Sequence, residues 1–152
     1  MVCNFGKISM KKFTSVLLLM FILGTASNCI AGKKGTSALG VKLTTPQLLS
    51  VSASLYPYHL WLVQFEPGIG GGKINVGLGG NWHYTIGAAV KLSILQTWGL
   101  PIGGIEPNQT YVGGEMELMW QGVNMSFGLY SHVSGSETNR DMIVSAGLGI
   151  GF

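Results

Sequence analysis

From residue 36 onward, apolar side chains recur at every second position, and turn-forming residues interrupt the pattern at regular intervals. The longest uninterrupted example is residues 82–94, where Ile86, Val90 and Ile94 share one face with Trp82. A two-residue period is typical of a β-strand, whereas an α-helix would scatter these side chains around its circumference. Residues 82–94 are therefore predicted to form one strand.

Segments of this kind account for most of the chain. They cover residues 36–44, 49–55, 60–66, 73–80, 82–94, 111–120, 123–132 and 141–152. The apolar phase changes from odd to even positions across residues 67–72, which requires a turn or bulge there. Their lengths are close to the ~9 to 11 residues that a tilted strand needs to cross a membrane. The pattern predicts an all-β fold, an eight-stranded antiparallel up-and-down transmembrane β-barrel.

The final segment, residues 141–152, ends on Phe152, in phase with its apolar face. This ending resembles the C-terminal strand of bacterial outer-membrane β-barrel proteins, in which a terminal Phe is read by the barrel-assembly machinery. The resemblance implies the outer membrane of a Gram-negative bacterium as the location. It implies outer-membrane lipid, lipopolysaccharide and the assembly machinery as partners.

The first 31 residues have a different pattern. Lys11 and Lys12 precede an apolar run at residues 16–23, and small residues up to Ala26 or Ala31 suit cleavage. This layout is typical of a secretory signal, and the run is shorter than the ~20 residues of a spanning helix. We expect residues 1–31 to be a signal peptide, with Met10 as an alternative start, and residues 32–152 to be the barrel.

Removal of such a signal changes the charge balance of the chain. Of the nine Lys and Arg residues, Lys7, Lys11 and Lys12 lie in the signal, so six basic residues remain against six acidic ones. A neutral chain without a basic patch gives no case for nucleic-acid binding. Cys3 and Cys29 are also removed, so no disulfide is expected.

The alternation places charged side chains on the inward face of the predicted barrel. They are Lys42, Lys73, Lys91, Glu66, Glu115 and Glu117. The interior of an eight-stranded barrel is just wide enough for side chains to fill it. Burying a charge there without a partner costs free energy. We therefore predict a lumen plugged by an ion-pair network, with a narrow cavity as the alternative.

Aromatic residues flank the predicted short turns at one end of the barrel. They are Tyr56, Trp61, Trp82, Tyr84, Trp120 and Phe152. Aromatic side chains of membrane barrels gather at the two interfaces of the bilayer. This set is expected to form a girdle at one interface.

One group of residues suggests catalysis. His132 and Ser134, followed by Asp141, resemble the His-x-Ser motif of the lipid A deacylases, in which a hydroxyl is activated for acyl transfer. In that family the acid is a Glu further along the chain and the site faces lipid, whereas His132 and Asp141 fall on the inward phase here. We interpret these residues as a polar strand end. His59 and His83 lack ligand spacing with His132, so no metal or cofactor is predicted.

Three functions remain as hypotheses. The preferred one is a non-enzymatic outer-membrane barrel with a structural or surface-interaction role, using the loops around residues 98–110 and 134–140. A lipid A-modifying barrel enzyme is the second. The third is a soluble lipocalin-like periplasmic barrel, which would hold Trp82, Ile86, Val90 and Ile94 inside and place its charges in water.

Overall fold

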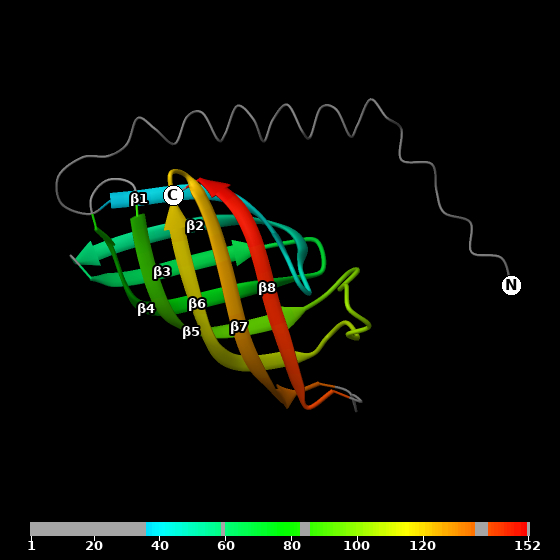
Figure 1. Cartoon of the computed structure of the whole chain (residues 1–152). Helices are drawn as coiled ribbons and strands as arrows, with labels where there is room; N and C mark the ends of the chain where they lie inside the picture. The colour runs from blue at the N-terminus through cyan, green and yellow to red at the C-terminus, as the bar shows by residue number, and fades with distance from the viewer. Residues whose placement is uncertain (1–35, 59, 83–85, 136–139, 152) are drawn as a thin grey trace, which may run out of the picture.

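The computed structural model describes residues 36–151, except 59, 83–85 and 136–139. This part of the chain forms eight antiparallel strands: β1 (Thr36–Thr44), β2 (Leu48–Tyr58), β3 (Trp61–Pro67), β4 (Gly71–Trp82), β5 (Ile86–Thr97), β6 (Thr110–Trp120), β7 (Val123–Ser134) and β8 (Met142–Gly151). Each strand pairs with the next, and β8 pairs with β1 to close a barrel (Figure 1). The prediction of an eight-stranded up-and-down barrel is confirmed. Among the described residues, no helix has the length and apolar character needed to cross a bilayer.

One predicted strand boundary is wrong. Trp82 ends β4 and pairs with Ile86 at the start of β5, so residues 82–94 are not one strand. Gly79 and Gly80 continue β4 as far as Trp82, opposite the small side chains of β5. Since the three residues between Trp82 and Ile86 are an odd number, both strands keep their apolar side chains at even positions. The alternation therefore passes through this connection without a visible break.

The phase change at residues 67–72 reflects a turn, as the sequence indicates. β3 ends at Pro67, β4 begins at Gly71, and the two strands pair from Pro67↔Gly72 onward. Side chains at odd positions are exposed on β3, whereas on β4 the exposed ones include Ile74, Val76 and Leu78.

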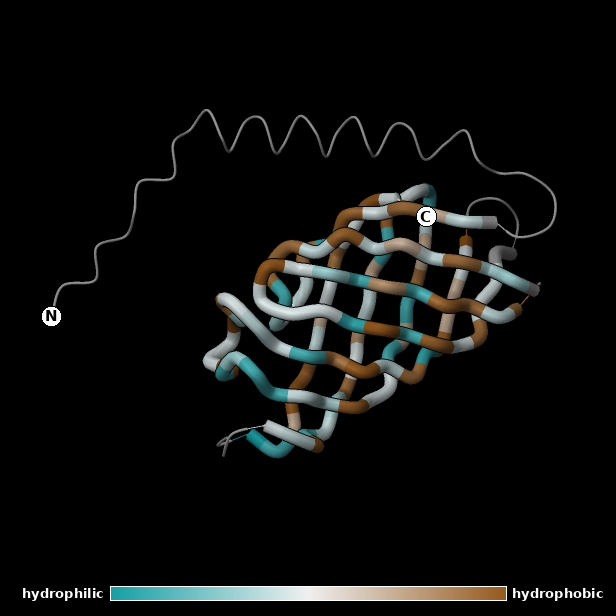
Figure 2. Tube along the Cα trace, turned by 180° about the vertical axis from the view of Figure 1, so that it is seen from behind, coloured by the Kyte–Doolittle hydropathy of each residue, from teal (hydrophilic) through white to brown (hydrophobic). Residues whose placement is uncertain are grey.

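The two faces of the sheet have opposite polarity, which appears as alternating colours along the strands in Figure 2. On β5, the side chains of Ile86, Val90 and Ile94 are exposed, whereas Lys91 and Ser93 are buried in the barrel. This arrangement is the reverse of that expected for a soluble lipocalin-like barrel.

The connections divide the barrel into two ends. At the loop end lie residues 45–47, 68–70 and 98–109, together with Gly135, Arg140 and Asp141; at the turn end lie residues 121–122. The β5–β6 loop folds over the loop end, where Ile105 is buried against apolar side chains of the lumen. The members of this cluster are Leu95, Ile105, Tyr111, Tyr130 and Ile143.

Candidate functional site

The charged side chains of the lumen are almost fully enclosed. Lys42, on β1, and Glu66, on β3, are both 0% exposed, and the others do not exceed 3%. The others are Lys73 on β4, Lys91 on β5, and Glu115 and Glu117 on β6. Strand alternation is the cause, because each of these residues lies on the phase opposite to the exposed apolar side chains.

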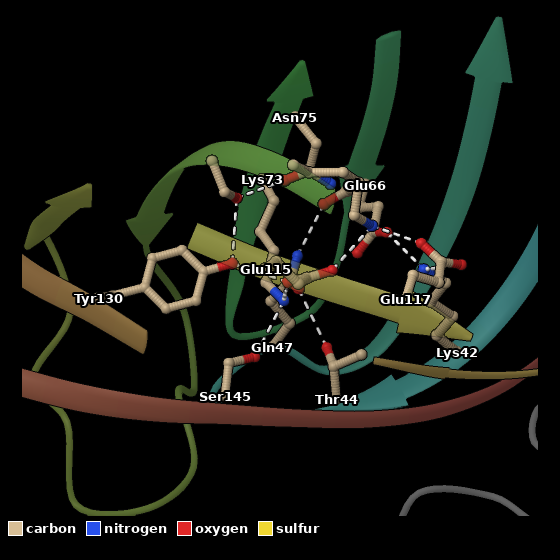
Figure 3. A network of polar contacts seen from close by, with 12 residues as sticks. Lys42, Thr44, Gln47, Glu66, Lys73, Asn75, Glu115, Glu117, Tyr130 and Ser145 are labelled. Atoms are coloured by element: carbon tan, nitrogen blue, oxygen red, sulfur yellow. Dashed lines mark hydrogen bonds and ion pairs between the residues drawn. The ribbon is translucent and has the colours of Figure 1, made fainter. Parts of the chain in front are cut away.

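The six groups form one chain of alternating charge, part of which is drawn in Figure 3. Lys42 Nζ lies 2.7 Å from Glu66 Oε1 and 2.9 Å from Glu117 Oε1. Lys91 Nζ bonds Glu117 Oε2 and lies 2.9 Å from Glu115 Oε1. Lys73 Nζ completes the chain, 2.8 Å from Glu115 Oε2. Three cations and three anions thus cancel within the lumen.

Neutral polar groups add hydrogen bonds to Lys91 and Glu115 in this chain of charges. Gln64 Oε1 accepts hydrogen bonds from Lys91 Nζ at 2.7 Å and from Asn75 Nδ2 at 2.9 Å. The hydroxyl of Tyr130 donates to Glu115 Oε2 at 2.7 Å and lies 3.0 Å from Ser93 Oγ. Buried ions are tolerated when further hydrogen bonds satisfy their remaining atoms. These hydrogen bonds satisfy Lys91 and Glu115 Oε2, whereas Glu115 Oε1 has only its ion pair with Lys91. Among the described residues, Glu66 Oε2 is buried without a hydrogen-bond partner.

Lys73 joins the network to the last strand. Its Nζ donates to Ser145 Oγ on β8 at 2.9 Å, and Ser145 Oγ donates to the carbonyl oxygen of Thr45 at 2.5 Å. The same ammonium lies 5.6 Å from the centre of the Tyr130 ring. These contacts connect β4 with both sides of the β1–β8 seam.

Inward glycines provide the space that the larger side chains occupy. A Cβ at Gly149 would lie 2.5 Å from Lys42 Cγ and 2.8 Å from Asn124 Oδ1. At Gly128 it would lie 2.7 Å from Tyr130 Cε2. At these positions the lumen is packed, because a neighbouring side chain fills the space that a side chain on the glycine would occupy.

Several lumen residues were not identified from the sequence. Strand parity does place Gln64, Tyr130 and Ser145 inward, but uncharged side chains gave no reason to select them. Gln47 carried no signal, since it lies in the β1–β2 turn; it is 0% exposed and donates from Nε2 to the carbonyl oxygen of Glu66 at 2.7 Å. Its burial depends on how the turn folds over the barrel.

Two of the three residues considered for catalysis, His132 and Asp141, are joined by a hydrogen bond between their backbones. The amide of His132 donates to the carbonyl oxygen of Asp141 at 2.7 Å. The ring of His132 lies 2.8 Å, through Nε2, from Gln109 Oε1 and packs edge-on against Tyr111, with ring centres 5.3 Å apart. The side chains of Ser134 and Asp141 are exposed. The contacts of the imidazole thus join it to Gln109 and Tyr111 at the wall of the loop end.

The aromatic set is only partly described. Trp61 and Trp120 lie at the turn end with 54% and 62% of their surface exposed, and Tyr56 is half-buried. Trp82 ends β4, but its side chain lies outside the described part, as do Tyr84 and Phe152. The aromatic girdle stays a prediction.

Three carboxylates come close enough to suggest a cation site. Oxygens of Glu66, Glu115 and Glu117 lie within 4.8 Å of one another. Each carboxylate, however, has a lysine ammonium within 2.9 Å, so the positive charge is already supplied by the protein. We assign this cluster to the ion-pair network.

Comparison with family models, with curated proteins and with solved structures gives no match.

Proposed function

We propose that this chain is a non-enzymatic outer-membrane barrel with a structural or surface-interaction role, its lumen plugged by ion pairs. The observation that carries the proposal is an apolar exterior on every strand around an ionic interior. Large apolar side chains that are exposed, one from each strand in order, are Leu43, Leu55, Phe65, Val76, Leu92, Met116, Phe127 and Leu148. In water this exterior would be a large exposed apolar surface, which is unfavourable, whereas in a bilayer the same surface contacts lipid instead of water.

The height of the exterior supports a bilayer as the environment. On β5 the outward side chains are apolar from Ile86 to Ile94 and become polar at Gln96. With ~3.3 Å per residue and a tilt of ~40°, this stretch is about 20 Å tall, near the ~25 Å apolar band of outer-membrane barrels. In the described part of the chain every strand also pairs with a neighbour on each side, so that the sheet closes on itself as hydrocarbon requires.

The orientation and partners follow as part of the proposal. Residues 1–31 would direct export, and the C-terminal strand would be read by the barrel-assembly machinery. In barrels of this class the short turns face the periplasm and the longer loops face outward. The β5–β6 loop and the β7–β8 connection would then lie beside lipopolysaccharide and carry any surface interaction.

Fractionation of a Gram-negative host that expresses the full chain tests the proposal. We expect the protein in the outer-membrane fraction after a urea wash, and its release by detergent. Unboiled samples should migrate differently from boiled ones on a gel, because a closed barrel resists unfolding by detergent. Release into the soluble fraction without detergent would contradict the proposal.

A further inference from the structure

The loop end of the barrel carries an unusually apolar area on one side. It consists of four exposed side chains, here called the apolar loop face: Leu48, Ile69, Trp98 and Leu100, with 40%, 49%, 39% and 74% exposure. They come from the start of β2, the β3–β4 turn and the start of the β5–β6 loop. These segments are in contact, since Trp98 Nε1 donates to the carbonyl oxygen of Gly68 at 3.1 Å.

Part of the backbone of these segments is bonded internally. Five amide groups donate to carbonyl oxygens of the same three connections or their flanking residues, at 2.8 to 3.3 Å. The pairs are Gly68→Gly71, Ile69→Leu49, Gly70→Gln47, Trp98→Gly70 and Ile102→Pro46. Irregular backbone enters hydrocarbon only where its polar groups are satisfied by the protein. This loop layer meets that condition at each of these amides.

The indole N–H of Trp98 is likewise bonded within the protein. A tryptophan at a membrane interface commonly keeps its indole N–H for polar partners outside the hydrocarbon. Here the N–H bonds the carbonyl oxygen of Gly68, and the ring packs so closely on Gly72 that a Cβ there would overlap it. The exposed edge of Trp98 is thus left with apolar atoms.

Leu48 adds a conformational observation. Its φ is +67°, in the left-handed region where a bulky side chain is uncommon and Gly or Asn is usual. The strained residue also exposes an apolar side chain. The strained backbone and the exposed side chain are both unfavourable in water. Contact with hydrocarbon would remove the cost of exposing the side chain.

The other side of the loop end has a different surface. Its exposed loop residues include the polar or charged Glu106, Asn108, Arg140 and Asp141. The exposed apolar side chains beside them, Val133 and Met142, belong to the strands β7 and β8. The apolar loop face, by contrast, continues directly from the exposed apolar side chains of β2, β3 and β4. Its surroundings therefore match those of the barrel wall.

We propose that the apolar loop face lies in the hydrocarbon of the outer leaflet and contacts lipid acyl chains. The inference rests on the proposed function. On the β1–β5 side the barrel would be covered by lipid up to and including its loops, while the polar side of the loop end stays in water.

Depth-dependent quenching of tryptophan fluorescence tests this placement. The full chain is reconstituted into phosphatidylcholine vesicles with bromine on the acyl chains, as a variant that retains only Trp98 (W61F, W82F, W120F). We expect acyl-chain bromine to quench Trp98 and aqueous iodide to leave it unaffected. A second reporter, Leu100→Trp in a chain whose four native tryptophans are Phe, should respond in the same way without depending on the packing of Trp98.

A variant that retains only Trp120, at the turn end, separates this inference from the proposed function. Quenching of Trp120 by bromine together with quenching of Trp98 by iodide would overturn the inference and leave the membrane barrel standing. Insensitivity of both to bromine would contradict the membrane barrel itself. Protection of Trp98 from both quenchers would indicate a protein partner or second copy on the face and would also overturn the inference.

Discussion

The side chain of Glu115 has three polar partners in the lumen. It accepts from Lys73 and Tyr130 through Oε2 and pairs with Lys91 through Oε1. The change Glu115→Gln keeps the shape but leaves two buried ammonium groups without their shared anion. Breaking a buried pair by removing one partner costs ~3–5 kcal/mol. We expect a loss of that size in the free energy of unfolding, measured by denaturant titration of the reconstituted protein.

The matched control is Glu106→Gln, because the side chain of Glu106 is exposed on the β5–β6 loop. It should leave the free energy of unfolding nearly unchanged. Equal stability of the two variants would mean that the ion pairs do not compensate the burial of their charges.

Gly149 tests how tightly the lumen is packed at the β1–β8 seam. In Gly149→Ala the new Cβ would meet Lys42 Cγ at 2.5 Å and the carbonyl oxygen of Val41 at 2.6 Å, and the backbone atom cannot easily move aside. Overpacking of this kind costs ~1–3 kcal/mol. We expect a lower denaturation midpoint.

The same substitution at Gly114, which faces outward, is the control. In Gly114→Ala, the nearest of the atoms around the new Cβ is 3.9 Å away, so the change should be neutral or slightly stabilising. A Gly149→Ala variant as stable as Gly114→Ala would show that the lumen has spare room.

Strand parity predicts which residues are buried but not which of them pair. Glu66 and Lys73 are register partners on β3 and β4, yet Glu66 pairs with Lys42 and Lys73 with Glu115. The choice depends on how the strands are staggered around the closed barrel and on the rotamers that fit there. Neither quantity is contained in the alternation of a single strand.

At the scale of an element, Thr97 anchors the β5–β6 loop. Its hydroxyl donates to the carbonyl oxygen of Glu106 at 2.8 Å and accepts from the amide of Gln109 at 3.0 Å. Thr97→Val removes both bonds at constant shape, and unsatisfied buried groups cost ~1–3 kcal/mol each. We expect faster hydrogen–deuterium exchange at Asn108 and Gln109.

Exchange in the rest of the barrel should not change, because the remaining ladder is intact. Ser131→Ala, on the exposed face of β7, is the control and should exchange like the unmodified protein. Loop exchange that is the same in both variants would show that the Thr97 hydroxyl does not hold the loop in place.

A change of phase in the alternation located one turn, and an unchanged phase concealed another. The turn after Pro67 changes the phase, whereas the connection between Trp82 and Ile86 preserves it. Glycine alone does not mark the boundary, because Gly79 and Gly80, a residue type typical of turns, pair inside β4. In a narrow barrel, small inward residues make room for larger ones, so glycine marks packing as well as turns.

At the scale of the whole molecule, the polarity of the exterior is the property that distinguishes a membrane barrel from a soluble one. Val90 lies midway along the apolar stretch of β5 and is 62% exposed, while Gln96 points to the same face near the loop end. The change Val90→Lys would put a charge near the bilayer midplane, at a cost of ~2–4 kcal/mol. The change Gln96→Lys, near the interface, should cost ~0–1 kcal/mol.

The free energy of unfolding from lipid vesicles measures this difference, and unfolding from detergent micelles provides the comparison. Both substitutions add the same side chain to the same strand and face, so their effects on strand pairing are matched. A depth-dependent penalty therefore reports the environment of the exterior rather than the fold. Equal stability of the two variants in vesicles would mean that the exposed face of β5 contacts water, and the membrane assignment would fail although the barrel remained.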